Sequence, residues 1–231
     1  MLRLVVAVTM LMMAGLTSAV AVTIDGSQAV GAVPGTAGTG LSAFFFKFDQ
    51  PMGPLSHADS LVAAAVSPTA TFIALTVCFP TCGAVSSDND SLSSYVARNG
   101  TALIGDSTLG LAVTQYKGYI AIPSAGTHTF SLKSDDGSAL YLGGTLAVNN
   151  DGSHGLKGPS ADVTFNAAGL YSFFLDHFEN AGRTGITLTM DGQMLATSSL
   201  YGIDDAVLPV PVPSSFGDGD VAAAPEPASI A

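Results

Sequence analysis

Short segments in which apolar and polar residues alternate follow one another through residues 109–190. In one of them His128, Phe130 and Leu132 are separated by threonine and serine. A period of two is typical of a β-strand that buries one face. The segments are separated by turn signals that contain Gly or Pro, at residues 123–126, 167–169 and 191–192. The chain is therefore predicted to be all-β, an antiparallel sandwich or barrel.

Segments outside this run fit the same fold. Residues 41–48 hold four phenylalanines and are expected to form the first core strand, followed by a second at residues 71–77. Residues 170–178 carry Phe on both faces, which predicts a central strand. A short helix is expected over residues 91–99, with Asp90 as its N-cap.

The ends of the chain differ from its middle. Residues 1–21 have an early Arg, an apolar run and a small-residue cleavage site, which predicts a secretory signal peptide. A membrane anchor is disfavoured because the apolar run is short. Residues 22–40 are expected to be a Gly-rich, loosely ordered lead-in to a domain over residues 41–205. Residues 206–231 are expected to be a disordered linker rich in Pro, Gly and Ala.

The composition excludes some functions. The formal net charge is -11, and the seven Lys and Arg residues are scattered singly, so nucleic-acid binding is not expected. The two cysteines, Cys78 and Cys82, are predicted to form a local disulfide in an exported chain. A zinc site is disfavoured because the chain has no other cysteine.

Two adjacent carboxylates, Asp135 and Asp136, stand between two predicted strands. Like charges at close range repel, and a bound cation removes that cost. Oxygen ligands of this kind suit calcium. The alternative is a polar hairpin turn, which Asp-Gly pairs often form.

Residues 118–123, 126–130 and 134–138, with the later residues 168–171 and 177–182, together resemble the protective-antigen-type (PA-14) family. The resemblance covers residues 41–193 and is strongest over residues 117–190. It implies a β-sandwich or barrel that often binds carbohydrate. In the sugar-binding members, two adjacent Asp residues joined by a cis peptide hold calcium, and sugar hydroxyls coordinate the ion.

The resemblance assigns roles to particular residues. Asp135 and Asp136 match the calcium-holding pair, and Asn180 matches the Asn that completes the shell. A sugar-facing loop would consist of Ala181, Gly182 and Arg183. Glu179 is a second-choice ligand beside Asn180.

Other polar residues have a structural interpretation as well. Asn150 and Asp151 could add oxygen ligands from a variable loop, but Asn and Asp also serve turns. Asp176 is expected to be a paired, structural carboxylate, and His128 and His177 are expected at the edge of the core. The run from Asp88 to Asp90 is interpreted as a helix cap.

No enzymatic activity is expected. The sequence has no Gly-x-Ser-x-Gly elbow, phosphate loop or zinc motif. A glycosidase places its carboxylate pair across a cleft rather than side by side.

Residues 225–229 resemble the opening of the PEP-CTERM sorting signal of Gram-negative bacteria, which an exosortase processes. In that family the signal continues into a membrane helix and a basic cluster, and residues 230–231 include neither. Two interpretations stay open: a truncated signal, or a protein that is secreted without an anchor. The sequence thus predicts a secreted or cell-surface, calcium-dependent lectin or adhesin-like module with a glycan or exopolysaccharide as its partner. The alternative is a structural matrix protein whose domain binds calcium or protein but no sugar.

Overall fold

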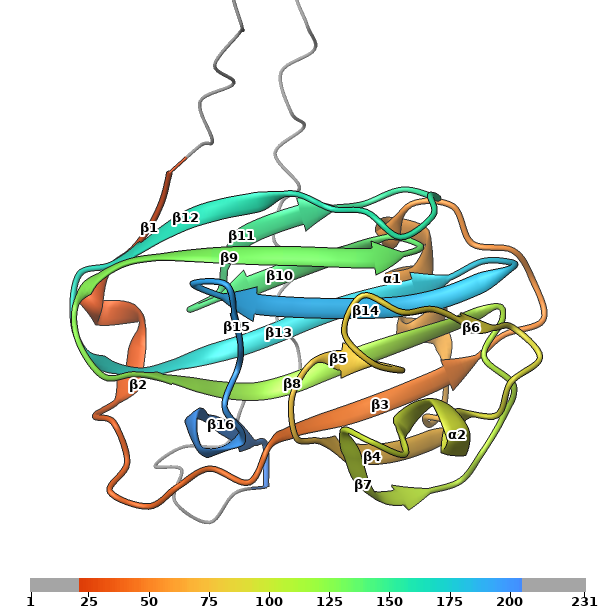
Figure 1. Cartoon of the computed structure of the whole chain (residues 1–231), viewed down its shortest axis with the longest axis horizontal. Coiled ribbons are helices and arrows are strands. Elements are labelled where there is room, and N and C mark those ends of the chain that lie inside the picture. The colour runs from red at the N-terminus through yellow and green to blue at the C-terminus, as the bar shows by residue number, and fades with distance from the viewer. Residues whose placement is uncertain (1–20, 205–231) are drawn as a thin grey trace, which may run out of the picture.

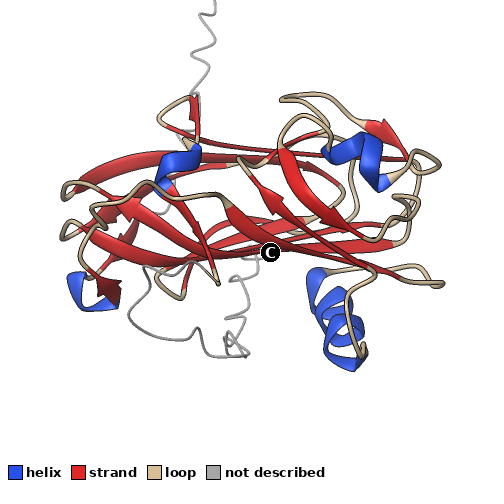
Figure 2. Ribbon diagram, turned by 90° about the horizontal axis from the view of Figure 1, so that it is seen from below, coloured by secondary structure: helices blue, strands red, loops and turns tan. Residues whose placement is uncertain are grey.

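A computed structural model of the chain describes residues 21–204. The predicted signal peptide, except its last residue Ala21, and the predicted linker over residues 206–231 lie outside the described residues. The described residues form two β-sheets that face each other (Figures 1 and 2). This confirms the predicted all-β, antiparallel sandwich. Among these residues no helix has both the length and the apolar character needed to cross a membrane.

The first sheet is antiparallel except at one edge, where β1 pairs with β12 in parallel. Its main path runs in the order β1 (Val22–Ile24), β12 (Ser160–Phe165), β9 (Gly126–Asp135), β14 (Arg183–Met190) and β15 (Gln193–Met194). Two short strands also pair with β14, namely β5 (Cys78–Phe79) and β6 (Ser86–Ser87).

The second sheet is antiparallel throughout. Its main path runs in the order β11 (Thr145–Asn150), β10 (Ser138–Leu142), β13 (Gly169–Glu179), β8 (Ala112–Ile122), β3 (Leu41–Lys47), β4 (Ala70–Ala74) and β7 (Gly100–Ile104). Two short strands extend it, β2 (Ala29–Gly31) on β13 and β16 (Leu200–Gly202) on β8.

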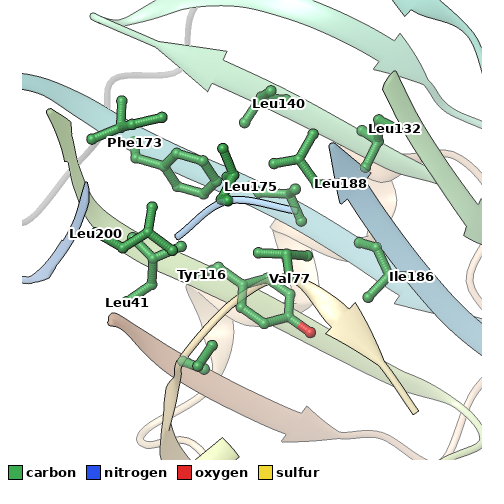
Figure 3. Close-up of a cluster of buried hydrophobic side chains, with 14 of the residues drawn as sticks. Leu41, Val77, Tyr116, Leu132, Leu140, Phe173, Leu175, Ile186, Leu188 and Leu200 are labelled. Atoms are coloured by element: carbon green, nitrogen blue, oxygen red, sulfur yellow. The ribbon is translucent and has the colours of Figure 1, made fainter. Parts of the chain in front are cut away.

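The main core lies between the two sheets. Leu132, Ile186 and Leu188 from the first sheet meet Tyr116 and Leu175 from the second (Figure 3). All five side chains are fully buried. Burial of apolar surface on this scale is the main source of stability for such a sandwich.

A second, smaller core lies on the outer face of the second sheet. There the helix α1 (Leu55–Ala64) packs Leu55 and Ala58 against Phe178 of β13. Because successive strand residues face opposite ways, β13 serves both cores, with Phe173 inside and Phe178 under the helix. This agrees with the prediction that this strand is central.

Two local expectations were wrong. The short helix α2 (Leu92–Val96) is capped by Ser91, whose hydroxyl accepts from the backbone N of Ser94 at 3.2 Å. Asp90 instead accepts from the backbone N of Ser87 at 2.9 Å. The Gly-rich lead-in is ordered, because β1 and β2 pair with strands of the two sheets and a short 3-10 helix, η1 (Gly26–Gln28), joins them.

A second 3-10 helix, η2 (Thr197–Ser199), precedes β16. Cys78 and Cys82 are joined by a disulfide, with their Cα atoms 4.8 Å apart. The bridge closes the loop that follows β5, where the Phe79–Pro80 peptide is cis. Phe79 is fully buried against the main core, so the loop is attached to the sandwich.

Candidate metal centre

The chain crosses from one sheet to the other at Asp135 and Asp136. β9 ends at Asp135 in the first sheet, and β10 begins at Ser138 in the second. β13, which pairs with β10, ends at Glu179, and β14 begins at Arg183. These strand ends lie at the right of the sandwich in Figure 1. The pair is thus a crossover between sheets and not the turn of a hairpin.

Gly137 makes this crossover possible because a larger residue would not fit. Its backbone oxygen accepts from the N of Phe178 at 3.0 Å. A Cβ at this position would lie 2.5 Å from Cε1 of Phe178 and 2.9 Å from the backbone N of Gly152. The Gly of the Asp-Asp-Gly motif is therefore required by close packing.

Asp136 is buried and its carboxylate is held by the backbone at both oxygens. Oδ1 accepts from the N of His154 at 2.7 Å, and Oδ2 accepts from the N of Asn180 at 2.9 Å. These two donors come from the two loops on either side of the crossover. They fix the direction in which the carboxylate points.

Asp135 precedes it through a cis peptide, as the family resemblance implies. Its backbone oxygen lies 2.9 Å from Nε2 of His177, which donates to it. Burial, followed by the charge of Asp136, raises the pKa of the Asp135 carboxyl to about 6. Burial lowers the pKa of His177 to about 4, so the ring is neutral.

Glu179 brings a third carboxylate to the pair. It lies two residues after His177 on β13 and is only 2 % exposed. Neither of its carboxylate oxygens has a hydrogen-bond partner among the described residues. Burial and the nearby charges of Asp136, Asp88 and Asp135 raise its pKa to about 10. Carboxylate oxygens of Glu179, Asp135 and Asp136 lie within 4.8 Å of one another.

This arrangement fits a divalent cation. Buried carboxylate oxygens without donors, such as those of Glu179, cost free energy, and three carboxylates together also repel each other. Among residues 21–204 the one ion pair within 4.0 Å joins His128 and Asp191, which are not part of this group. A hard cation such as calcium would satisfy the oxygens and neutralise the repulsion.

The predicted ligand Asn180 lies at the site, but its side chain makes another contact. Its Oδ1 accepts from the backbone N of Met52 at 3.0 Å. The structure thus brings Glu179, the neighbouring residue, to the Asp pair, and a metal-binding role for the Asn180 amide stays a prediction. Ala181, Gly182 and Arg183 follow as an exposed loop beside the carboxylates.

Asn150 and Asp151 make contacts that support the fold. Nδ2 of the buried Asn150 donates to Oγ of Ser134 at 2.8 Å. Oδ1 of Asp151 accepts from the backbone N of Leu55 at 2.8 Å and so caps α1. A ligand role for either side chain stays a prediction.

The three remaining polar residues have contacts that fit a structural role. Asp176 is buried on the outer face of the second sheet, near Asp59 and Lys117. His177 is buried at the crossover, and Nδ1 of the partly buried His128 lies 2.7 Å from Oδ2 of Asp191. Asp176 was expected to be paired, but among the described residues it forms no ion pair within 4.0 Å and its Oδ2 has no hydrogen-bond partner. The structural role of Asp176 and of the two histidines stays a prediction.

Asp88 is the residue that sequence reasoning missed. Interpreted as part of a helix cap, it instead accepts from the backbone N of Gly182 and lies near the Glu179 carboxyl. The run of acidic and amide residues around it was the available signal. Its partner is 94 residues away, so the sequence alone could not show the contact.

The comparisons with known proteins agree on the fold. Residues 104–199 match the PA14 domain family. A search of curated proteins finds no significant match.

Several solved structures share the architecture. The PA14 sugar-binding domain from an RTX adhesin superposes with a TM-score of 0.60 at 18% identity, covering 72% of this chain and 99% of that one. The PA14 domain of the MpAFP antifreeze protein gives 0.59 at 19% identity, covering 73% and 94%. The A domain of epithelial adhesin 6 from Candida glabrata, solved with Galβ1-3GlcNAc, gives 0.51 at 18% identity, covering 76% and 92%. The chain therefore carries a PA14-like fold, with a PA14 domain match over residues 104–199.

Proposed function

We propose that this protein is a secreted, calcium-dependent carbohydrate-binding module of the lectin or adhesin kind, without enzymatic activity. The observation that carries the proposal is the buried Glu179, whose two carboxylate oxygens lack donors beside Asp135 and Asp136. Such oxygens are satisfied by a cation, and calcium takes oxygen ligands in a flexible shell.

In this proposal Asp135, Asp136 and Glu179 hold the ion, and the calcium supplies a centre at which sugar hydroxyls replace water. The backbone N–H groups of His154 and Asn180 orient Asp136, and His177 orients Asp135. The protein's task is thus to fix three carboxylates at one point.

Specificity would come from the exposed loop of Ala181, Gly182 and Arg183. Gly182 has a φ of 106°, a conformation that a residue with a side chain rarely adopts. The guanidinium of Arg183 can donate several hydrogen bonds to sugar hydroxyls. The sugar-binding RTX adhesin domain and the Candida adhesin domain solved with a disaccharide support a glycan as partner.

An extracellular location belongs to the same proposal. The predicted signal peptide, the Cys78–Cys82 disulfide and the adhesin neighbours all favour export. Processing of the PEP-CTERM-like residues 225–229 by an exosortase, in a Gram-negative bacterium, belongs to this proposal as a separate expectation.

A glycan array with and without calcium tests the function. Wild-type protein should bind at least one class of glycan in calcium and lose that binding in excess chelator. Asp136→Ala should abolish both glycan binding and calcium-induced thermal stabilisation, whereas Asp162→Ala on the remote strand β12 should change neither. Glycan binding that survives chelation would contradict the proposal.

A second candidate is a structural matrix protein that uses calcium for stability and binds no sugar. The unusual number of acidic groups near the site, with Asp88 added to the three carboxylates, favours tight ion binding whether or not a sugar follows. A calcium-dependent melting shift without glycan binding on the array would select this candidate.

A further inference from the structure

Asp88 lies in the loop that follows β6, which is attached to the sugar-facing side of the site. β6 pairs with the start of β14, with Ser87 opposite Arg183. The backbone N of Asp88 donates to the backbone oxygen of Gly182 at 3.3 Å, and Oδ2 of Asp88 accepts from the N of Gly182. Main chain and side chain of one residue thus hold both polar groups of Gly182.

The backbone oxygen and the side-chain carbons of Asp88 are held in place as well. Its backbone oxygen accepts from the N of Leu109 at 3.0 Å and from the N of Gly110 at 3.2 Å. A Cβ on Gly110 would lie 2.9 Å from Cγ of Asp88. The carboxylate is therefore held in one place by its surroundings and has little freedom to turn away from the site.

This contact with Gly182 explains only one carboxylate oxygen of Asp88. Oδ1 is buried and has no hydrogen-bond partner among the described residues. The carboxyl lies close enough to that of Glu179 for the two to interact, and both carry negative charge once they are ionised, as ligands of a cation are. The charge of Lys47 interacts with that of Asp88, but its Nζ donates to the backbone oxygen of Gly110.

We propose that Asp88 is a fourth carboxylate ligand of the same ion, and that the bound ion locks the loop of Asp88 onto the loop of Asn180 to Arg183. The inference rests on the proposed calcium site and adds to it a residue outside the Asp-Asp-Gly motif. Its support is geometric: Oδ1 of Asp88 and both carboxylate oxygens of Glu179 are buried without a donor, and Oδ2 of Asp88 accepts from Gly182, three residues after Glu179.

The proposal implies that the ion binds before the sugar-facing loop takes its final shape. Without the ion, ionised carboxylates on Asp88 and Glu179 would repel each other, which opposes the contact between the two loops. Once it is bound, Asp88 holds Gly182 in its left-handed conformation next to the exposed Ala181 and Arg183. Calcium therefore shapes the sugar-facing loop through Asp88 as well as offering coordination sites to hydroxyls.

The test compares Asp88→Asn with Asp90→Asn, which removes the same charge from the same loop two residues later. Calcium affinity is measured by calorimetry, with terbium luminescence as a second probe of the ion site. Asp88→Asn should weaken calcium at least about tenfold, since ligand charge sets the affinity of such sites. Asp90→Asn should match wild type.

Melting in chelator separates a ligand from a structural residue. The Asn oxygen can still accept from Gly182, and its NH₂ group can donate to Glu179, so Asp88→Asn should melt no lower than wild type without calcium. A residue that only braces the loop would instead lower the melting temperature with and without calcium and leave the affinity of the remaining folded protein unchanged. Hydrogen exchange at Gly182 should slow with calcium in wild type and respond less in Asp88→Asn.

The outcomes distinguish this inference from the proposed function. If wild type binds calcium and Asp88→Asn binds it equally well, the fourth-ligand assignment is overturned while the site stands. If wild type binds no calcium, both are overturned. If calcium binding depends on Asp88 but no glycan binds, the assignment stands and the sugar-binding proposal falls.

Discussion

Nε2 of His177 donates to the backbone oxygen of Asp135 across 2.9 Å, which ties the crossover between the two sheets to the central strand β13. The ring is buried and neutral, because burial lowers the pKa of His177 to about 4. It therefore acts through Asp135 as a positioning residue.

Replacing this ring tests that role. His177→Leu removes the donor and leaves a buried carbonyl unsatisfied, which should lower the free energy of unfolding by about 1–3 kcal/mol and weaken calcium binding. His177→Gln can still donate and should recover part of both losses. Chemical denaturation and calcium titration of the two variants measure this. Equal calcium affinity in wild type and His177→Leu would show that the contact does not position Asp135.

Glu179→Gln separates the metal site from the fold. Without the ion the carboxyl of Glu179 is protonated at neutral pH, because its pKa is raised to about 10, and Gln is a neutral side chain of the same size, so the melting temperature in chelator should stay about the same. The calcium-induced rise in melting temperature should largely disappear, because a ligand charge is lost. Asp162→Asn, on β12 away from the crossover, serves as the control. A full calcium response in Glu179→Gln would exclude Glu179 from the shell.

Stability should depend on pH in opposite directions with and without calcium. Without the ion, the folded-state pKa values of Asp135 and Glu179 are raised to about 6 and about 10. The folded protein then binds more protons than the unfolded chain, so these groups should make it less stable as the pH rises from about 5 to about 7.

With saturating calcium the sign reverses, because the ion requires ionised carboxylates and protons compete with it. The calcium-induced melting shift should therefore be smaller at about pH 5 than at about pH 7. The lowered pKa values of Asp106 and Asp191 act below this window. Melting curves at the two pH values, with calcium or chelator, test the prediction, and a calcium shift independent of pH would contradict it.

Asp151→Ala should affect the fold and leave the metal site intact. Its Oδ1 accepts from the first N–H of α1, at Leu55, and loss of such a cap costs about 0.5–2 kcal/mol. Asp151→Asn keeps an acceptor and should be close to wild type. Denaturant unfolding measures the loss of stability, and calcium titration should give the wild-type affinity for both variants. A loss of calcium affinity in Asp151→Asn would restore Asp151 as a ligand.

The strands were predictable because their signal is local. Residues 127–133 alternate with a period of two, and the structure places Phe130 and Leu132 in the main core. The same reasoning could have gone further at the metal centre. Phe173 and Leu175 face the interior. Every second residue of a strand faces the same way, so His177 and Glu179 lie on that face of β13, whereas Asn180 does not.

Other features depend on contacts between distant parts of the chain. α1 begins after Pro54 without a side-chain cap of its own, and its first N–H is satisfied by Asp151, 96 residues later. Asp88 meets Gly182 across 94 residues. No local pattern encodes such pairs, so neither the helix nor the fourth carboxylate could be inferred from neighbouring residues.

Both limits of the described chain lie away from the crossover. β1 joins β12, whose last residue Phe165 pairs with Gly126, at the opposite end of β9 from Asp135. β16 pairs with β8 at Gly118 to Ile120. The residue of β8 that pairs with Glu179 is Ala112, at the other end of that strand. The carboxylates and the two limits of the described chain therefore occupy different parts of the sandwich.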